Sequence, residues 1–251
     1  MADALLRIDG LAKHFGGVVA TDDLDLEVAQ GEVHALIGPN GAGKTTLIAQ
    51  IAGSLPPDAG TIRFRGADIT RLAQHARVAA GLARSYQITS IFRGFTVRDN
   101  LALAVQARSG SSLSFWRPVA AERALFDEAD RVAERVGLGE RGDVLAATLA
   151  HGEQRALEVG LALATNPALL LLDEPMAGMG PEESARMVEL VARVREHVTV
   201  LLVEHDMDAV FRLADRISVL VNGGIIATGT PDAIRADPEV RRAYLGDELA
   251  A

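Results

Sequence analysis

The stretch Gly38-Pro39-Asn40-Gly41-Ala42-Gly43-Lys44-Thr45-Thr46 follows an apolar run at 33–37 and precedes a helix-prone segment at 47–52. Its spacing matches G-x-x-x-x-G-K-[ST], the phosphate loop, whose glycines let backbone N–H groups turn toward a polyphosphate at a helix start. In such a loop Lys44 reaches the β and γ phosphates, and the Thr45 hydroxyl binds Mg²⁺. The alternative is a Gly-rich turn without a ligand, and the flanking strand and helix argue against it. The stretch therefore predicts a nucleotide site.

Bulk composition narrows the class of protein. The chain has 251 residues, 49% hydrophobic and 24% charged, which is typical of a globular protein with a sizeable core. A net charge of -9 argues against nucleic acid as the main partner, because that binding depends on Lys and Arg. The absence of cysteine excludes disulfides and thiolate metal sites, and it leaves the cytosol as the default compartment.

The sequence offers no segment that would enter a membrane. The N-terminus has an early acid and no basic region before an apolar one, so we do not expect a signal peptide. The longest apolar runs, 168–172 and 198–203, fall far short of the roughly 20 residues that span a bilayer. Any role at a membrane is therefore expected to be peripheral.

Strand and helix patterns predict an α/β fold. Segments 5–8, 24–28 and 61–65 read as two-faced strands, and 32–37 as a buried one. From about 97 to 165 the chain is helical, with Leu125, Ala129, Val132 and Val136 on one face. Strands at 168–172, 199–203 and 216–221 then alternate with helices at 181–197 and 206–213, as crossover units of a parallel sheet do.

The middle of the helical stretch contains a loop-like segment, 109–118, which carries Trp116. Trp116 either anchors this loop onto its own helices or serves as a docking aromatic. The sequence leaves both readings open.

Two acids follow the buried strand 169–172. Asp173 would lie at the carboxyl end of that strand, where open α/β sheets bind their ligands, and could hold Mg²⁺ through its water shell. Glu174 could then accept a proton from a water in line with the γ phosphate, as a general base. Two ordinary solvated acids are the alternative, and the phosphate loop makes it the weaker one.

The combination resembles the nucleotide-binding domain of ABC (ATP-binding cassette) proteins, and a further segment favours this family over phosphate-loop kinases and GTPases. Leu149-Ala150-His151-Gly152-Glu153, before a helix-prone run, looks like the family's signature motif. The resemblance implies that this motif completes the ATP pocket of the opposite subunit. The usual motif is Leu-Ser-Gly-Gly-Gln, and loss of the serine hydroxyl removes a bond to a charged phosphate worth about 1.5 to 3 kcal/mol. We expect a weakened site.

Other positions match the family singly. Gln87 resembles the Q-loop glutamine, which touches Mg²⁺ or its water and passes the nucleotide state to a membrane partner, and His205 resembles the switch histidine that bonds the γ phosphate. Phe15 resembles the aromatic that stacks on adenine, although a core or loop anchor is equally compatible. Gly180 stands where the family's inter-subunit loop usually has an acid or asparagine, so no side-chain contact is expected there.

Within the family, the Phe-Gly-Gly start, the Ala-x-Gly signature and the ending 229–246 resemble the ATPases of branched-chain amino-acid importers. Relatives serving urea, short amides or lipopolysaccharide export share much of this. A soluble ABC ATPase and a phosphate-loop kinase are weaker alternatives. Ile88, Ile91, Phe92 and Phe95 could line a groove for a permease helix or could be ordinary core.

The resemblance implies one nucleotide-binding domain: an α/β phosphate-loop (RecA-like) core at 1–87 and 166–251, an N-terminal antiparallel β subdomain and a helical subdomain at about 88–165. It implies ATP and Mg²⁺ as ligands. The expected partners are a second ABC ATPase subunit (the same chain or a close paralogue), membrane permease subunits and, indirectly, an extracytoplasmic solute-binding protein. The expected location is the cytoplasmic face of the cell membrane.

Overall fold

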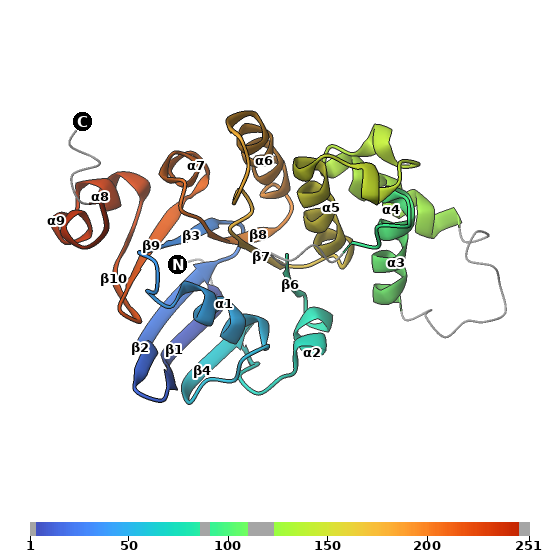
Figure 1. Cartoon of the computed structure of the whole chain (residues 1–251). Helices are drawn as coiled ribbons and strands as arrows, with labels where there is room; N and C mark the ends of the chain where they lie inside the picture. The colour runs from blue at the N-terminus through green and yellow to red at the C-terminus, as the bar shows by residue number, and fades with distance from the viewer. Residues whose placement is uncertain (1–3, 86–90, 110–122, 246–251) are drawn as a thin grey trace. The chain divides into compact units, whose positions relative to one another are not determined.

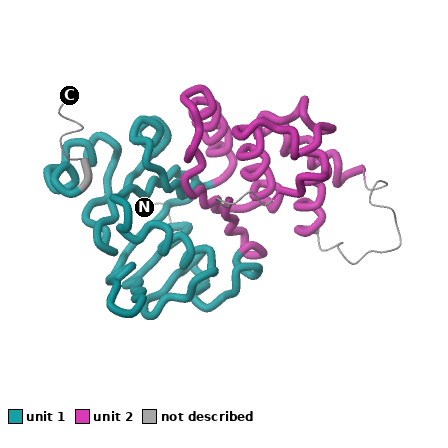
Figure 2. The backbone as a smooth tube through the Cα atoms, in the orientation of Figure 1, with its two compact units in different colours: residues 1–77, 199–251 teal, residues 78–198 magenta. Residues whose placement is uncertain are grey.

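The computed structural model describes residues 4–85, 91–109 and 123–245. The chain forms two compact units, one of residues 1–77 and 199–251 and the other of residues 78–198 (Figure 2). We call them unit 1 and unit 2. The predicted Gln87, Ile88 and Trp116 lie outside the described residues.

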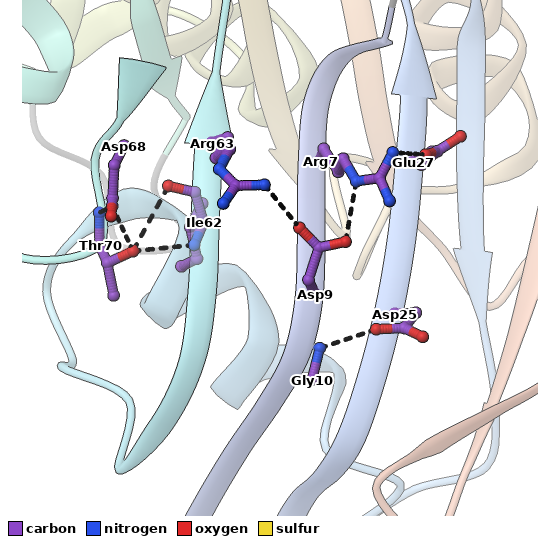
Figure 3. Close-up of polar contacts among 9 residues, drawn as sticks. All are labelled: Arg7, Asp9, Gly10, Asp25, Glu27, Ile62, Arg63, Asp68 and Thr70. Atoms are coloured by element: carbon purple, nitrogen blue, oxygen red, sulfur yellow. Dashed lines mark hydrogen bonds and ion pairs between the residues drawn. The ribbon is translucent and has the colours of Figure 1, made fainter. Parts of the chain in front are cut away.

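Unit 1 contains an antiparallel sheet of strand order β2-β1-β4-β5 (Figure 1). Its strands are β1 (Ala4–Phe15), β2 (Val18–Ala29), β4 (Ala59–Phe64) and β5 (Ala67–Asp68). The solvated face carries a ladder of ion pairs in which Asp9 binds Arg7 at 2.8 Å and Arg63 at 3.3 Å, and Arg7 also binds Glu27 at 3.0 Å (Figure 3). Surface pairs of this kind add little stability, but opposite charges on neighbouring strands favour this register.

A second sheet in unit 1 runs in the order β10-β9-β3-β8. Strands β3 (Val33–Ile37), β8 (Thr199–Val203) and β9 (Arg216–Val221) are parallel, and β10 (Gly224–Gly229) pairs with β9 antiparallel. Strands β3 and β8 are buried throughout, as expected of parallel strands covered on both faces.

Helices of unit 1 pack against this sheet. Val210 of one helix, and Ile234 and Val240 of two others, join Ala35, Ile37, Ile217 and Val219 in one buried cluster. These helices are α7 (Met207–Leu213), α8 (Pro231–Ala236) and α9 (Pro238–Val240), with the π-turn η5 (Arg241–Leu245) after them. Unit 1 also contains α1 (Lys44–Ala52), which follows β3. A short helix, α2 (Gln74–Ala79), crosses from unit 1 into unit 2.

Unit 2 combines two parallel strands with a group of helices. Strands β6 (Leu82–Arg84) and β7 (Leu169–Asp173) pair, with Leu82 opposite Leu169. The helices are α3 (Val97–Ser109), α4 (Arg123–Arg135), α5 (His151–Ala164) and α6 (Pro181–Val194), and the 3₁₀ turns are η3 (Gly139–Arg141) and η4 (Ala146–Thr148). The face predicted for α4 is buried at all four positions.

The predicted combination of parallel strands, an antiparallel sheet and helices is present. Strand β9 has the predicted bounds, and helix α6 ends at Val194, three residues before the predicted end at His197. Strands β1 and β2 are longer than predicted, because bulges near Gly10 and Asp23, both with positive φ, let pairing continue. The boundaries proposed for the helical subdomain stay a prediction.

Candidate functional site

The phosphate loop lies between β3 and α1, where the sequence places it. The first hydrogen bond of α1 runs from the Leu47 N–H to the Gly43 carbonyl, so the N–H groups of Thr45 and Thr46 have no acceptor within the helix. Gly43 precedes the helix at φ 109°, and no acid lies in the first turn. This end of α1 therefore offers backbone donors and the positive end of a helix dipole to an anion.

Lys44 is buried at the start of α1 and bends back over its own loop. Its ammonium donates to the carbonyl oxygens of Gly38 at 2.6 Å and Pro39 at 3.0 Å. These two bonds hold the Lys44 ammonium beside the backbone of the loop. In this position the ammonium could bind the phosphate oxygens of a ligand.

Close backbone packing explains two of the glycines. A Cβ on Gly38 would lie 2.1 Å from the Leu220 carbonyl oxygen, and one on Gly43 would lie 2.1 Å from the Ala20 carbonyl oxygen. The loop is also tied to the turn between β9 and β10, because the Gly223 N–H donates to the Ala42 carbonyl at 3.0 Å. Strands on both sides therefore fix the shape of the loop.

Phe15 ends β1 and is 50% exposed. Val18, its partner across the β1–β2 turn, is also exposed, and the Lys13 ammonium lies 5.6 Å from the ring centroid. An exposed ring beside an apolar side chain can stack on a planar base. The reading of Phe15 as a core anchor is not supported, because half of the side chain is in solvent.

Asp173 is the last residue of β7 and is buried. One of its carboxylate oxygens binds the Arg84 guanidinium at 2.8 Å, across the β6–β7 pair. Glu174 follows at φ 49°, in the left-handed region that side chains other than Gly seldom adopt. The Ala177 N–H donates to the Glu174 carbonyl at 3.1 Å and closes the turn. Such backbone strain is common at functional sites.

The signature-like segment opens α5, and Ala150 is its N-cap. Ala150 has no side-chain oxygen, but its N–H donates to Glu153 at 3.0 Å, which is half of a capping box. Glu153 also binds Arg141 at 3.0 Å. Its neighbour on the helix, Gly152, donates its N–H to Oε1 of Glu183 on α6 at 3.2 Å. Glu153, which stands at the usual glutamine position, thus holds the helix start.

His205 is exposed just beyond β8, in unit 1. The backbone N–H of His205 donates to the Glu204 carboxylate at 2.8 Å. The cap of α7 is the next residue, Asp206, whose carboxylate accepts the Ala209 N–H at 3.1 Å. Capping therefore does not account for the His205 side chain.

The candidate residues fall into two groups, which we describe separately. Unit 1 holds Phe15, the loop 38–46 and His205, and unit 2 holds 149–153, Asp173 and Glu174. Sequence reasoning missed Arg84, Val18 and Glu183. A cation beside the predicted Asp173 could have been sought, whereas no local pattern marks a contact between residues 152 and 183.

Comparisons with known proteins show the family of the chain. Residues 21–177 match the family model for the ABC transporter, and these include the phosphate loop, the signature-like segment, Asp173 and Glu174. The chain belongs to the ABC transporter family. It is therefore an ATP-binding and ATP-hydrolysing subunit, and the predicted family and fold class are confirmed.

Full-length relatives narrow the group. The chain is 41% identical to the high-affinity branched-chain amino acid transport ATP-binding protein LivG of Salmonella typhimurium, over 98% of this chain and 100% of that one. It is 39% identical to BraF of Pseudomonas aeruginosa over the same shares, and residues 225–250 match a model for the branched-chain amino acid ATP-binding cassette transporter. A solved ATP-binding cassette of an ABC transporter, in its ADP conformation, is 30% identical with a TM-score of 0.85, covering 98% of this chain and 100% of that one.

Two features are absent from the described residues of the chain. Residues 4–85, 91–109 and 123–245 contain no helix long and apolar enough to cross a bilayer. The same part of this ABC subunit has no cluster of three His, Asp or Glu side chains arranged to bind a metal.

Proposed function

We propose that the chain is one of two ATPase subunits that together drive a membrane permease for branched-chain amino acids, with Mg-ATP enclosed between the two subunits. The observation that carries the substrate class is the match of residues 225–250 to the branched-chain transporter model. The full-length similarity to LivG and BraF supports it. The 36% identity to the lipopolysaccharide export ATP-binding protein LptB keeps export as the second candidate.

ATP binding begins in unit 1. Adenine stacks on Phe15 beside Val18, and base stacking of this kind is worth about 1 to 3 kcal/mol. The N–H groups from Gly41 to Thr46 surround the phosphates. Lys44 exchanges its two carbonyl acceptors for phosphate oxygens, which is favourable because the new partners carry full charges.

Mg²⁺ would neutralise charge on the β and γ phosphate oxygens. The residues assigned to it, partly through water, are Thr45, Asp173 and Gln87. Two of them carry the oxygen ligands that a hard cation prefers, since Thr45, an exposed residue, has a hydroxyl and Asp173 has a carboxylate at the end of β7. The ion pair with Arg84 holds this carboxylate in place at the end of β7.

Hydrolysis needs an activated water. Glu174 accepts a proton from the water as its oxygen attacks the γ phosphorus, and the bond from that phosphorus to the β–γ bridging oxygen breaks to release ADP and phosphate. His205 donates a hydrogen bond to the γ phosphate and stabilises its charge. The turn at Glu174 has a strained φ, which supports the view that its side chain is held for a task.

The signature-like segment supplies the second half of the pocket. The segment consists of Leu149 and the N-cap Ala150, followed by His151, Gly152 and Glu153, the first residues of α5. The N–H groups at this helix start meet the γ phosphate of the other subunit's ATP. Ala150 offers no hydroxyl, so backbone donors carry this contact. The second subunit is either another copy of the chain or a close paralogue.

A surface in unit 2 is suited to the permease. Phe92, Phe95 and Leu145 are 58%, 45% and 48% exposed, and the two rings lie 5.6 Å apart between centroids. The buried Asn100 fixes their segment, since its side chain accepts the Phe92 N–H at 2.8 Å and donates to the Phe92 carbonyl at 3.0 Å. Ile91, grouped with them by sequence, is buried and belongs to the core.

Purification from native membranes through a tag on this chain tests the proposal. We expect permease subunits to co-purify, and expect leucine, isoleucine or valine, added with the cognate solute-binding protein, to stimulate ATP hydrolysis in liposomes. A matched Phe92→Ser/Phe95→Ser variant should lose the permease and keep ATP binding. Stimulation by a lipopolysaccharide precursor or by urea instead would replace the substrate assignment.

A further inference from the structure

We propose that Glu183 competes with the γ phosphate for the signature-like segment, and so sets the ATP concentration at which two subunits close on each other. The inference rests on the proposed function, because it concerns the same half-site. It adds a residue that lies outside the signature-like segment and gives it a defined role, that of an internal anion in the place of the ligand.

The contact is direct. Gly152 is the second residue of α5, and its N–H is one of the first-turn donors that have no acceptor within the helix. Glu183 Oε1 accepts this N–H at 3.2 Å. A Cβ built on Gly152 would lie 3.2 Å from Oε1 and 3.4 Å from Cδ and Cγ, so the Glu183 side chain lies against the glycine.

Electrostatics favour an anion at this point. The N-terminal end of a helix carries a partial positive charge, which attracts a carboxylate and a phosphate alike. Glu183 lies in the first turn of α6, and its carboxylate reaches across to α5. A phosphate oxygen from the other subunit needs the same donor and would meet a like charge there. The two anions therefore exclude each other.

The Glu183 side chain also has space for a second position away from Gly152. A cavity of about 470 Å³ in unit 2 is lined by Gly152, Glu183, Arg141 and Arg186, among others. Arg186 lies three residues after Glu183 on α6, within reach of an i,i+3 ion pair. Its present partner, Glu182, is 3.9 Å away and highly exposed. Glu183 can thus leave Gly152 and keep a cationic neighbour.

The Ala150 substitution makes this competition more important. The usual serine would give the γ phosphate a second donor beside the backbone. In this chain the backbone N–H groups carry the contact, so a carboxylate on Gly152 blocks a larger share of it. Closure of a symmetric dimer must free two such contacts, and the effect on the dimer dissociation constant is the square of the effect at one site.

ATP-dependent dimerisation in a Glu174→Gln background, followed by sedimentation velocity during an ATP titration, measures this competition. We expect Glu183→Gln to favour each half-site by about threefold, which tightens the dimer by about tenfold. Glu183→Ala should have the larger effect. Glu182→Gln, which removes a neighbouring charge without touching Gly152, is the matched control and should behave as the parent.

Amide hydrogen exchange at Gly152 gives a second readout without nucleotide. Glu183→Ala should speed this exchange several-fold, and Glu182→Ala should leave it unchanged. Dimers that form at the same ATP concentration in Glu183→Gln and Glu182→Gln would overturn the role of Glu183 alone. Absence of an ATP-dependent dimer in every variant, with ATP still bound by the monomer, would overturn the two-subunit site itself.

Discussion

Gly43 is the residue at which the phosphate loop becomes helix α1. Its φ of 109° is unfavourable for other residues, and the Ala20 carbonyl fills the space of a Cβ. Gly41 in the same loop also has a positive φ, of 80°, but nothing lies within 4 Å of its Cβ position. A side chain at position 41 would therefore meet backbone strain alone, whereas one at position 43 would meet backbone strain and a steric clash.

The pair predicts different costs. Gly41→Ala should lower the free energy of unfolding by about 1 to 2 kcal/mol, the strain of a left-handed residue. Gly43→Ala adds a clash with backbone and should cost more than about 3 kcal/mol, or displace the loop and abolish ATP binding. Urea unfolding and ATP titration measure both effects. Equal costs at the two positions would contradict the close approach to Ala20.

Glu174 provides the test of the hydrolytic step. Glu174→Gln keeps size and one acceptor oxygen but cannot accept a proton, so turnover should fall by at least about 100-fold, the usual contribution of a general base. Binding of ATP should be unchanged, and ATP should hold the protein as a dimer. Glu182→Gln, at an exposed position, serves as control. Full activity of Glu174→Gln would assign the base elsewhere.

Sequence reasoning at this scale succeeded where the signal is local. The loop from Gly38 to Thr46 lies between a strand and a helix as predicted, because its glycines, lysine and flanking apolar run lie within one short stretch. Glu183 could not be found in this way, since its partner Gly152 is 31 positions away and only the packing of two helices brings them together. The ion pair of Arg84 with Asp173 depends likewise on strand pairing.

At the scale of elements, Arg77 fixes the far end of α1. Its side chain is 1% exposed, and Nη1 donates to the carbonyls of Gln50 and Ile51, both at 2.7 Å. Nε binds the Leu72 carbonyl at 3.0 Å, and Nη2 binds the Thr70 carbonyl at 2.9 Å. Burial lowers the pKa of Arg77, but the negative end of the helix and four carbonyls favour its charge.

Replacement of Arg77 should therefore destabilise the helix that carries Lys44. Arg77→Lys keeps the charge but cannot span four carbonyls, and should cost about 2 to 4 kcal/mol of unfolding free energy. Arg71→Lys, at an exposed position nearby, should cost less than about 0.5 kcal/mol. Chemical denaturation compares the two. A loss below 1 kcal/mol for Arg77→Lys would show that the contacts hold the helix weakly.

Elements were predicted best where they are buried and uniform. Strands β3, β7 and β8 are mostly apolar and fully buried, and the structure has them close to the predicted bounds. Strand β10 was missed, because residues 224–229 show neither clean alternation nor full burial. The cap of α1 by Arg77 was also missed, since it joins elements 26 residues apart.

At the scale of the whole molecule, two buried carboxylates predict how stability changes with pH. Burial alone raises the pKa of Glu32, but its bonds to His34 and the Ala29 N–H, with Arg216 nearby, hold the pKa below its usual value of 4.5. Burial also raises the pKa of Glu158 on α5, and there the Arg155 partner does not offset it. The shifts are opposite.

Their signs follow from proton linkage. Because the folded state holds the proton on Glu32 more weakly than the unfolded chain, this group stabilises the fold above pH 4.5, and the contribution is lost as pH falls through its lowered pKa. For Glu158 the stabilising contribution is complete below pH 4.5 and is lost as pH rises through its raised pKa.

Melting temperature against pH measures both. Glu32→Gln should lower the melting temperature at pH 7 and flatten the decline below pH 4.5. Glu158→Gln should change the melting temperature relative to the parent more favourably at pH 7 than at pH 4. If both variants change the pH dependence of the melting temperature in the same direction, the assignment of opposite pKa shifts to Glu32 and Glu158 is contradicted.

The turn at Asn222 and Gly223 connects the last two strands of the sheet to the phosphate loop. The Gly223 N–H holds the Ala42 carbonyl, and the segment that matches the branched-chain model begins two residues later, at Ile225. The phosphate loop and the segment that matches the branched-chain model are therefore separated by two residues and one backbone hydrogen bond. A change in the β9–β10 turn that shifts the Gly223 amide would also move the Ala42 carbonyl, and with it the backbone of the phosphate loop. Substitutions in this turn, far from Lys44 in the sequence, are thus expected to alter the affinity for ATP.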